Sequence, residues 1–220
     1  MTLVIYISGD GITPEMLAPL IEYLRNHGIR IIQIPLREET SEISSRELTA
    51  SSYNSYIESF IPKSESHLVL VGESKGCFHL TRFASTSRMK DRVDKLILIE
   101  PTTMKPDLLV EFERQRGNDY IEDYAREPGV NENLDPTEKT IDEMVSDTRK
   151  YIPRCRTIIV WTTHDNAKNP YTPDVVHLKR EYERFLRSNG CNLKVIHRVG
   201  NHCQDMEAKN YPFILRLLSE

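Results

Sequence analysis

The feature of this sequence that most restricts its fold is a series of six short apolar runs, separated by segments with helical periodicity. Most of these runs are continuous rather than alternating and are rich in Val and Ile, as strands buried on both faces of a parallel sheet require. The runs are Leu3–Ile7, Ile29–Ile34, His67–Val71, Lys95–Ile99, Thr157–Trp161 and Leu193–His197. Strands that alternate with helices predict an α/β fold, with a doubly wound, mainly parallel six-stranded sheet flanked by helices.

The clearest helical segment lies between the first two runs and has recognisable signals at both ends. Thr13 can cap its amino end with Pro14 at the first helical position, and Gly28 follows its last turn. Its apolar face is predicted to consist of Met16, Leu17, Leu20, Ile21 and Leu24. Further helices are predicted over residues 53–61, 75–87 and 172–189, so that a helix stands between most neighbouring runs.

The interval between the fourth and fifth runs is much longer than a crossover requires. It extends over roughly 50 residues, whereas a simple crossover between parallel strands needs about a dozen. Residues 103–150 contain 13 acidic and 7 basic side chains, a net charge of −6, and helical patterns cover 108–126 and 137–151. We therefore expect a small, acidic helical cap over 103–154, inserted into a single domain that spans 1–220.

Composition and charge exclude several classes of protein. The chain has 220 residues, 39% of them hydrophobic and 28% charged, which is ordinary for one globular domain. Its net charge of −4 and the lack of any basic run give no reason to expect a nucleic-acid partner. No apolar stretch approaches the roughly 18 residues that cross a bilayer, and the amino end lacks a signal peptide's basic segment, so we expect a cytoplasmic protein. The four cysteines show no metal-binding spacing and are expected to be free thiols.

The third run leads directly into a turn that contains the candidate nucleophile. This turn reads Gly72-Glu73-Ser74-Lys75-Gly76, and a helical segment follows it. A GxSxG sequence between a strand and a helix presents a serine on a sharp turn, and the small residues on either side let strand and helix approach closely. Ser74 is the candidate nucleophile, and the amide of Lys75, at the start of the helix, would point at a developing oxyanion. The alternative is a glycine-rich turn without chemistry.

A serine hydroxyl is a poor nucleophile unless a base removes its proton. Among the seven histidines, His202 stands just beyond the carboxyl end of the last run, at the edge where the crevice of an open α/β sheet lies. A solvated loop histidine is the alternative. Asp165 follows the fifth run at the same edge and is the candidate for the acid that orients the imidazole. Glu100, at the end of the fourth run, is the alternative acid.

In its GxSxG turn and in the chain order Ser74, Asp165, His202, the sequence resembles the α/β-hydrolase superfamily. The resemblance covers roughly residues 1–102 and 155–220, with the cap inserted where many members have one. It differs in that the first run corresponds to the third strand of the superfamily, so that the sheet lacks the usual first two strands.

The loop after the first run is a second difference from the superfamily. It reads Ser8-Gly9-Asp10-Gly11, where many members have His-Gly followed by the second oxyanion donor. By the resemblance, the amide of Asp10 is the candidate for this donor, and Gly11 is the alternative. The glycines permit the unusual backbone angles that such a loop needs.

The resemblance implies a serine hydrolase that cleaves a small-molecule carboxylic ester or thioester through an acyl-enzyme on Ser74. Such a mechanism needs neither a metal nor an organic cofactor. An acyltransferase with the same triad is one alternative, because an alcohol or thiol then replaces water as the acceptor. A non-catalytic ligand-binding protein that retains the fold is another, since fold alone does not establish activity.

Overall fold

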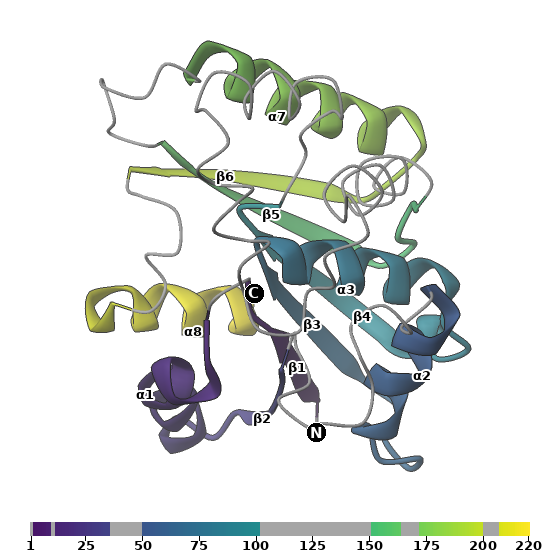
Figure 1. The fold of residues 1–220 in the computed structure, drawn as a ribbon, viewed down its shortest axis with the longest axis vertical. Coiled ribbons are helices and arrows are strands. Elements are labelled where there is room, and N and C mark those ends of the chain that lie inside the picture. Colours follow the sequence, from purple (N-terminus) through teal and green to yellow (C-terminus); the bar gives the residue numbers. More distant parts are fainter. Residues whose placement is uncertain (1, 10–11, 36–49, 102–150, 164–171, 200–206) are drawn as a thin grey trace, which may run out of the picture.

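The computed structural model describes residues 2–9, 12–35, 50–101, 151–163, 172–199 and 207–220. In these residues a sheet of six parallel strands lies between two layers of helices (Figure 1). In chain order the elements are β1 (Leu3–Ile7), α1 (Pro14–Asn26), β2 (Arg30–Ile34), α2 (Ala50–Ser59), β3 (Leu68–Glu73), α3 (Lys75–Thr86), η1 (Lys90–Arg92), β4 (Val93–Ile99), β5 (Arg156–Thr163), α7 (Thr172–Ser188), β6 (Leu193–Val199), η3 (Ala208–Asn210) and α8 (Tyr211–Ser219). The predicted doubly wound, six-stranded parallel sheet is confirmed.

The strand order determines which loops meet at the carboxyl edge of the sheet. The order is β2-β1-β3-β4-β5-β6, and every neighbouring pair is parallel. All six carboxyl ends therefore lie at one edge, and ligands of open α/β sheets bind outside that edge. Strands β5 and β6 pair as far as Thr163 opposite Val199, so the loops that follow them start side by side.

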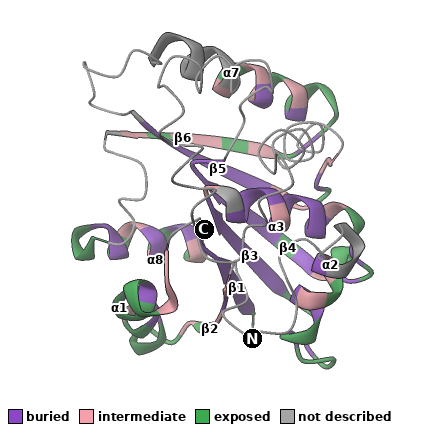
Figure 2. Ribbon diagram, in the orientation of Figure 1, coloured by how far each residue is buried: buried purple, intermediate pink, exposed green. Residues whose placement is uncertain are grey.

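Alternate residues of each strand face opposite helical layers. On β3, Val69 and Val71 belong to the core beneath α1 and α8, whereas Leu68 and Leu70 belong to the core beneath α2, α3 and α7. Figure 2 shows β1, β3, β4 and β5 almost wholly buried, and β6, at the edge, with intermediate and exposed residues. Both faces of the sheet are covered, which explains the continuous apolar runs. No helix within the described ranges is both long and apolar enough to cross a membrane.

Helix α1 has the predicted end signals and differs from the prediction on its buried face. The Thr13 hydroxyl accepts a hydrogen bond from the Met16 amide (3.4 Å), and Gly28 adopts a φ of 79° beyond the last turn. Met16 itself is 47% exposed, so its predicted place in the core is wrong. The buried residues are Leu17, Leu20, Ile21 and Leu24. At about 100° per residue Met16 lies roughly 90° from the centre of that stripe, which turns it to solvent.

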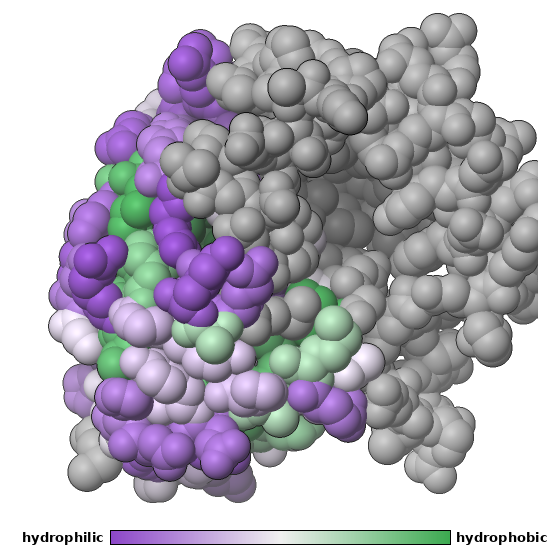
Figure 3. All heavy atoms as spheres, turned by 90° about the vertical axis from the view of Figure 1, so that its left-hand side faces the viewer, coloured by the Kyte–Doolittle hydropathy of each residue, from purple (hydrophilic) through white to green (hydrophobic). Residues whose placement is uncertain are grey.

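Helix α8 closes the sheet on the α1 side. The buried Lys95 side chain, on β4, donates hydrogen bonds to the carbonyls of Leu217 and Leu218 at 3.1 Å each, and so satisfies two acceptors at the end of this helix. Figure 3 views the molecule from the side on which α1 and α8 lie. The described surface there places hydrophilic residues beside hydrophobic ones, as the outer faces of amphipathic helices do.

The predicted acidic cap over 103–154 lies outside the described residues, apart from residues 151–154. These four residues run without regular structure into β5, and Ile152 packs against the core on the α3 side. The division of the chain into one domain with an inserted cap therefore stays a prediction.

Candidate active site

The chain turns sharply from β3 into α3 at Ser74, which has a φ of 50° and a ψ of −119°. A positive φ is strained for a residue with a side chain, and such residues cluster at functional sites. Two backbone hydrogen bonds hold the turn: the Ser74 amide donates to the Ile99 carbonyl (2.9 Å), and the Cys77 amide donates to the Ser74 carbonyl (3.0 Å). The strand, turn and helix predicted around the GxSxG sequence are therefore present, with Ser74 at the turn.

The two glycines of this turn stand where no side chain fits. A Cβ at Gly76 would lie 2.2 Å from the Ile7 carbonyl oxygen, on the neighbouring strand β1. A Cβ at Gly72 would lie 2.7 Å from the Cα of Cys77, in the first turn of α3. Both distances are far below van der Waals contact, so the close approach of strand and helix requires glycine at each position.

The loop after β1 approaches the candidate nucleophile directly. A Cβ at Gly9 would lie 2.8 Å from the Cβ of Ser74 and 3.5 Å from its Oγ. The Ser8 hydroxyl donates to the Ile12 carbonyl (3.4 Å) and so joins the two ends of this loop. Asp10 and Gly11, the predicted donors to an oxyanion, lie outside the described residues. The start of their loop nevertheless lies against Ser74.

Helix α3 begins at Lys75, immediately after Ser74. The first amides of a helix have no acceptor within the helix, and its amino end has a partial positive charge. The amide of Lys75 therefore stands at the one end of α3 that attracts negative charge. This is the position that a donor to an oxyanion on a Ser74 adduct would occupy.

Cys77 lies in the first turn of α3 and is a free thiol. It is close to the turn over residues 72–76, which we call the nucleophile turn after its candidate, Ser74. Its Sγ lies 3.1 Å from the Gly72 carbonyl and 3.3 Å from the Ile99 carbonyl, so it is a hydrogen-bond donor to the turn. Burial raises the pKa of this thiol well above its ordinary value. The described thiols of Cys155 and Cys191 are also free, as predicted, and Cys203 lies outside the described residues.

A carboxyl group lies buried directly beside the candidate nucleophile. Glu73 is fully buried, and the Tyr6 hydroxyl donates to its Oε2 (3.2 Å). The sequence gives little warning of this burial, because a glutamate in a glycine-rich turn is ordinarily exposed. Tyr6 comes from β1, so the nucleophile turn is tied to its neighbouring strand by a side chain as well as by the glycine contacts.

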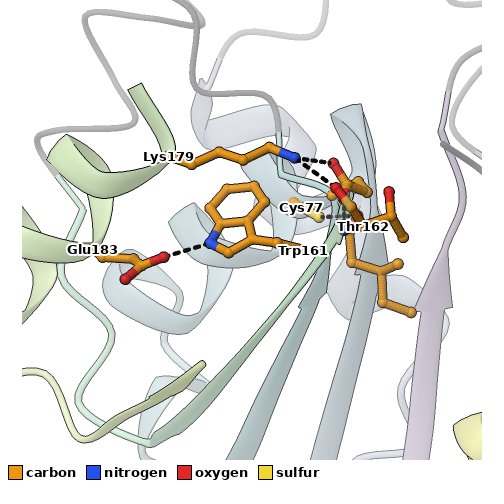
Figure 4. Close-up of polar contacts among 7 residues, drawn as sticks. Cys77, Trp161, Thr162, Lys179 and Glu183 are labelled. Atoms are coloured by element: carbon orange, nitrogen blue, oxygen red, sulfur yellow. Dashed lines mark hydrogen bonds and ion pairs between the residues drawn. The ribbon is translucent and has the colours of Figure 1, made fainter. Parts of the chain in front are cut away.

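Glu100, the alternative acid, makes its contacts with β5 and α7, on the side of β4 that faces away from β3. Its carboxylate accepts a hydrogen bond from the Thr162 amide through Oε1 and forms an ion pair with Lys179 through Oε2 (3.0 Å). The Lys179 ammonium also donates to the Thr162 carbonyl (3.2 Å) and lies 4.8 Å from the centre of the Trp161 ring (Figure 4). The Trp161 ring donates in turn to Glu183 (2.7 Å). This cluster joins β4, β5 and α7.

Asp165 and His202, the predicted acid and base, lie outside the described residues. Asp165 follows the last residue of β5, Thr163, by two positions, and His202 follows the last residue of β6, Val199, by three. Both loops therefore leave adjacent strands at the edge of the sheet where Ser74 lies.

The residues before and after the loop that follows β6 contact each other. Arg198, near the end of β6, donates to the side-chain oxygen of Asn210 (2.7 Å), which lies in η3 just before α8. The same guanidinium lies 3.8 Å from the centre of the Phe213 ring. These contacts hold the two ends of the His202 loop together.

Several other histidines have structural contacts within the described residues. His79 stacks on Tyr53 with ring centroids 3.8 Å apart, and His67 pairs with Asp94 at 3.0 Å. Among the described residues, no group of three or more His, Cys, Asp or Glu side chains is arranged to hold a metal ion.

The structure is similar to those of several solved enzymes. They include an enol-lactonase from Burkholderia xenovorans (TM-score 0.64, 14% identity, 100% of this chain and 92% of that one) and a carboxylesterase from Nitrososphaera gargenis (0.64, 14%, 99% and 90%). An esterase from Thermogutta terrifontis has a TM-score of 0.59 and 18% identity, covering 100% of this chain and 90% of that one. No protein-family model and no curated protein matches the sequence. At such identities the likeness shows the fold alone, which is that of the α/β hydrolases.

Proposed function

We propose that this chain, which has the α/β-hydrolase fold, is a serine hydrolase that cleaves a small-molecule carboxylic ester or thioester through an acyl-enzyme on Ser74. The strained backbone of Ser74 is the observation that carries the proposal. A φ of 50° at a residue with a side chain is maintained by the Ile99 and Cys77 hydrogen bonds and by glycine-only contacts. Strain of this kind, at the amino end of a helix and the carboxyl edge of a parallel sheet, is typical of a nucleophile.

The reaction proceeds in two steps, acylation and deacylation, and His202 accepts and returns one proton in each. His202 takes the hydroxyl proton of Ser74 while Oγ attacks the substrate carbonyl carbon, which gives a tetrahedral intermediate. The amides of Lys75 and Asp10 donate to its oxyanion. The imidazolium, stabilised by Asp165, gives the proton to the leaving alcohol or thiol. Water then attacks the acyl-enzyme by the same route, releasing the carboxylic acid and restoring Ser74.

The contacts of Glu100 support Asp165 as the acid of the triad. The Glu100 carboxylate is bound by Lys179 and by the Thr162 amide, so a histidine would have to compete with both. Asp165 belongs instead to the loop after β5, beside the loop that contains His202. The similar structures are named as a carboxylesterase, an esterase and an enol-lactonase, which supports an ester as the bond that is cleaved.

A fluorophosphonate probe, which reacts with activated serines, tests the proposal. We expect the native chain to be labelled and Ser74→Ala to remain unlabelled. Ser85→Ala is the matched control, since Ser85 lies in α3, the helix that follows Ser74, and donates its hydroxyl to the Thr81 carbonyl (2.8 Å). Labelling of His202→Ala and Asp165→Asn should be slower by at least about 100-fold, because the hydroxyl then lacks its base or the base its orientation.

The outcomes separate the proposed function from its alternatives. A native chain that stays unlabelled, where a control hydrolase reacts, would contradict the proposal and favour a ligand-binding protein. If Asp165→Asn is labelled at an unchanged rate, the acid of the triad is Glu100 instead of Asp165. If p-nitrophenyl acetate yields more ester or thioester product than free acetate when an alcohol or thiol is added, the chain is an acyltransferase.

A further inference from the structure

The chain leaves the sheet at Glu100, just after β4. The Glu100 side chain there accepts a hydrogen bond that a backbone carbonyl would accept in a regular sheet. The Glu100 amide donates to the Val160 carbonyl (2.9 Å), as expected for the regular parallel ladder between β4 and β5. In such a ladder the Glu100 carbonyl would accept the next hydrogen bond, from the Thr162 amide. Glu100 instead has a φ of 50°, and its carboxylate Oε1 accepts that bond.

Lys179, from α7, binds the backbone carbonyl of Thr162, the residue whose amide is bound by Glu100. Its ammonium donates to the Thr162 carbonyl (3.2 Å) and to Oε2 of Glu100 (3.0 Å). Two side chains thus bind the backbone of Thr162, which lies two residues beyond Val160, the last residue of β5 that pairs with β4. Figure 4 shows the Lys179 side chain extended over Trp161 to reach both oxygens.

Two features of this arrangement, a buried ion pair and a strained backbone, each lower the stability of the fold. The side chains of Lys179 and Glu100 are only 13% and 4% exposed, so both charges have lost most of their hydration. The left-handed backbone of Glu100 is strained, and such strain persists where the surroundings over-determine it. Both features act on Thr162, three residues before Asp165.

We propose that Lys179 and Glu100 are positioning residues that set the direction in which the chain leaves β5 toward Asp165. The inference rests on the proposed function, in which Asp165 orients His202. Because Lys179 and Glu100 fix both polar backbone atoms of Thr162, they determine where the following loop begins. A displacement of about 1 Å at a catalytic group can lower a rate about 100-fold, so this control acts on the reaction rate.

The test uses Lys179→Met, which keeps the length of the side chain and removes its charge. We expect kcat for p-nitrophenyl acetate and the rate of fluorophosphonate labelling to fall about 10- to 100-fold, with KM within about 2-fold of its original value. Labelling should still reach one probe per chain at long times. Lys179→Arg keeps the charge and the donors, so it should recover most of the rate.

The decisive measurement combines this change with Asp165→Asn. If Lys179 acts through Asp165, then adding Lys179→Met to the Asp165→Asn chain should slow labelling by less than about 3-fold, since the two effects are not additive. Lys95→Met is the matched control, because Lys95 is also a buried lysine bound to backbone carbonyls. It should lower the urea midpoint and leave the labelling rate of the folded protein unchanged.

The possible failures can be told apart. Equal slowing by Lys179→Met with and without Asp165 would overturn the inference and leave a purely structural ion pair, and an unchanged rate in Lys179→Met would also overturn it. An unlabelled native chain would overturn the proposed function and the inference together. If Lys179→Met does not unfold cooperatively in urea, the double variant Glu100→Gln/Lys179→Met, which removes both charges, replaces it with the same expectations.

Discussion

The nucleophile turn and the end of β5 are built by different means, although both lie at the carboxyl edge of one sheet. The nucleophile turn depends on the absence of side chains, since glycines at 72 and 76 let β3, α3 and β1 approach within distances that a Cβ would not permit. The end of β5 depends on the presence of side chains, because Glu100 and Lys179 bind the backbone of Thr162. One region is therefore fixed by close backbone packing, and the other by charged groups from distant parts of the chain.

The two regions should therefore tolerate different substitutions. Backbone packing has no conservative substitute, because every larger residue meets the same atoms. A side-chain contact can be weakened in steps, by changing its charge, its length or its hydrogen-bonding atoms one at a time. We therefore expect the nucleophile turn to fail completely when altered and the end of β5 to fail gradually.

The largest effect is expected for Gly76→Ala. Its Cβ would lie 2.2 Å from the Ile7 carbonyl oxygen, a backbone atom of β1, which is hydrogen-bonded to a strand on either side. We expect the free energy of unfolding to fall by about 3 kcal/mol or more, measured by urea denaturation.

Gly28→Ala is the control for this change. Gly28 has a φ of 79° and nothing within 4 Å of its missing Cβ, so only the backbone preference is lost. Gly28→Ala should lower the free energy of unfolding by about 1 kcal/mol. Equal effects of the two substitutions would show that the nucleophile turn does not depend on close packing.

The second prediction concerns Cys77, whose thiol lies between the nucleophile turn and the end of β4. Burial raises the pKa of this thiol well above 9.0 in the folded protein, so above pH 9 the unfolded state releases a proton that the folded state keeps. Stability from this group is complete below pH 9 and decreases as the pH rises. Between pH 8 and pH 10 the native chain should therefore lose about 1.4 kcal/mol more than Cys77→Ala.

Urea titrations at the two pH values measure this difference. Lysines and tyrosines titrate in the same range, but they are common to both proteins and cancel in the comparison. A decrease of the same size in Cys77→Ala would mean that the Cys77 thiol ionises as readily in the folded state as in the unfolded one.

The smallest effect is expected for Glu183→Gln, at the end of β5. Glutamine keeps an acceptor for the Trp161 ring nitrogen and removes only the charge from this hydrogen bond (2.7 Å). We expect the free energy of unfolding, measured by urea denaturation, to fall by less than about 1 kcal/mol, since the acceptor is partly exposed. Trp161→Phe should cost more, because Trp161 is fully buried and the smaller ring leaves a cavity as well as losing the hydrogen bond. A loss in Glu183→Gln as large as that of Gly76→Ala would remove the distinction between the two regions.

The sequence predicts the sheet well because its strands must be apolar on both faces. All six runs correspond to observed strands within a few residues, and the GxSxG turn lies between β3 and α3 as predicted. Helix α8 is absent from the prediction, although Tyr211, Ile214 and Leu217 recur on its buried face. The placement of Met16 in the core is wrong, because an apolar residue at the flank of a stripe meets no partner.

The cluster at the end of β5 is a contact that the sequence does not reveal. Glu100 and Lys179 are 79 residues apart. The sequence predicts Glu100 only as an alternative acid, and Lys179 looks like an ordinary charged residue of a helix. Their pairing depends on the adjacency of β4 and β5 and on the backbone turn at Glu100, which are tertiary properties. Asp165, His202, Asp10 and the cap over 103–154 lie outside the described residues and stay predictions.

The position of the long insertion between β4 and β5 has a consequence for the order of folding. β4 ends at Ile99 and β5 begins at Arg156, so their pairing must close a loop of more than 50 residues. The pairing of β3 with β4 closes only the short segment around α3. Because distant contacts form slowly, we expect the nucleophile turn to be assembled before the end of β5. Pulse-labelled hydrogen exchange should then protect the amides of β3 and β4 earlier than those of β5 and β6, and the reverse order would contradict this expectation.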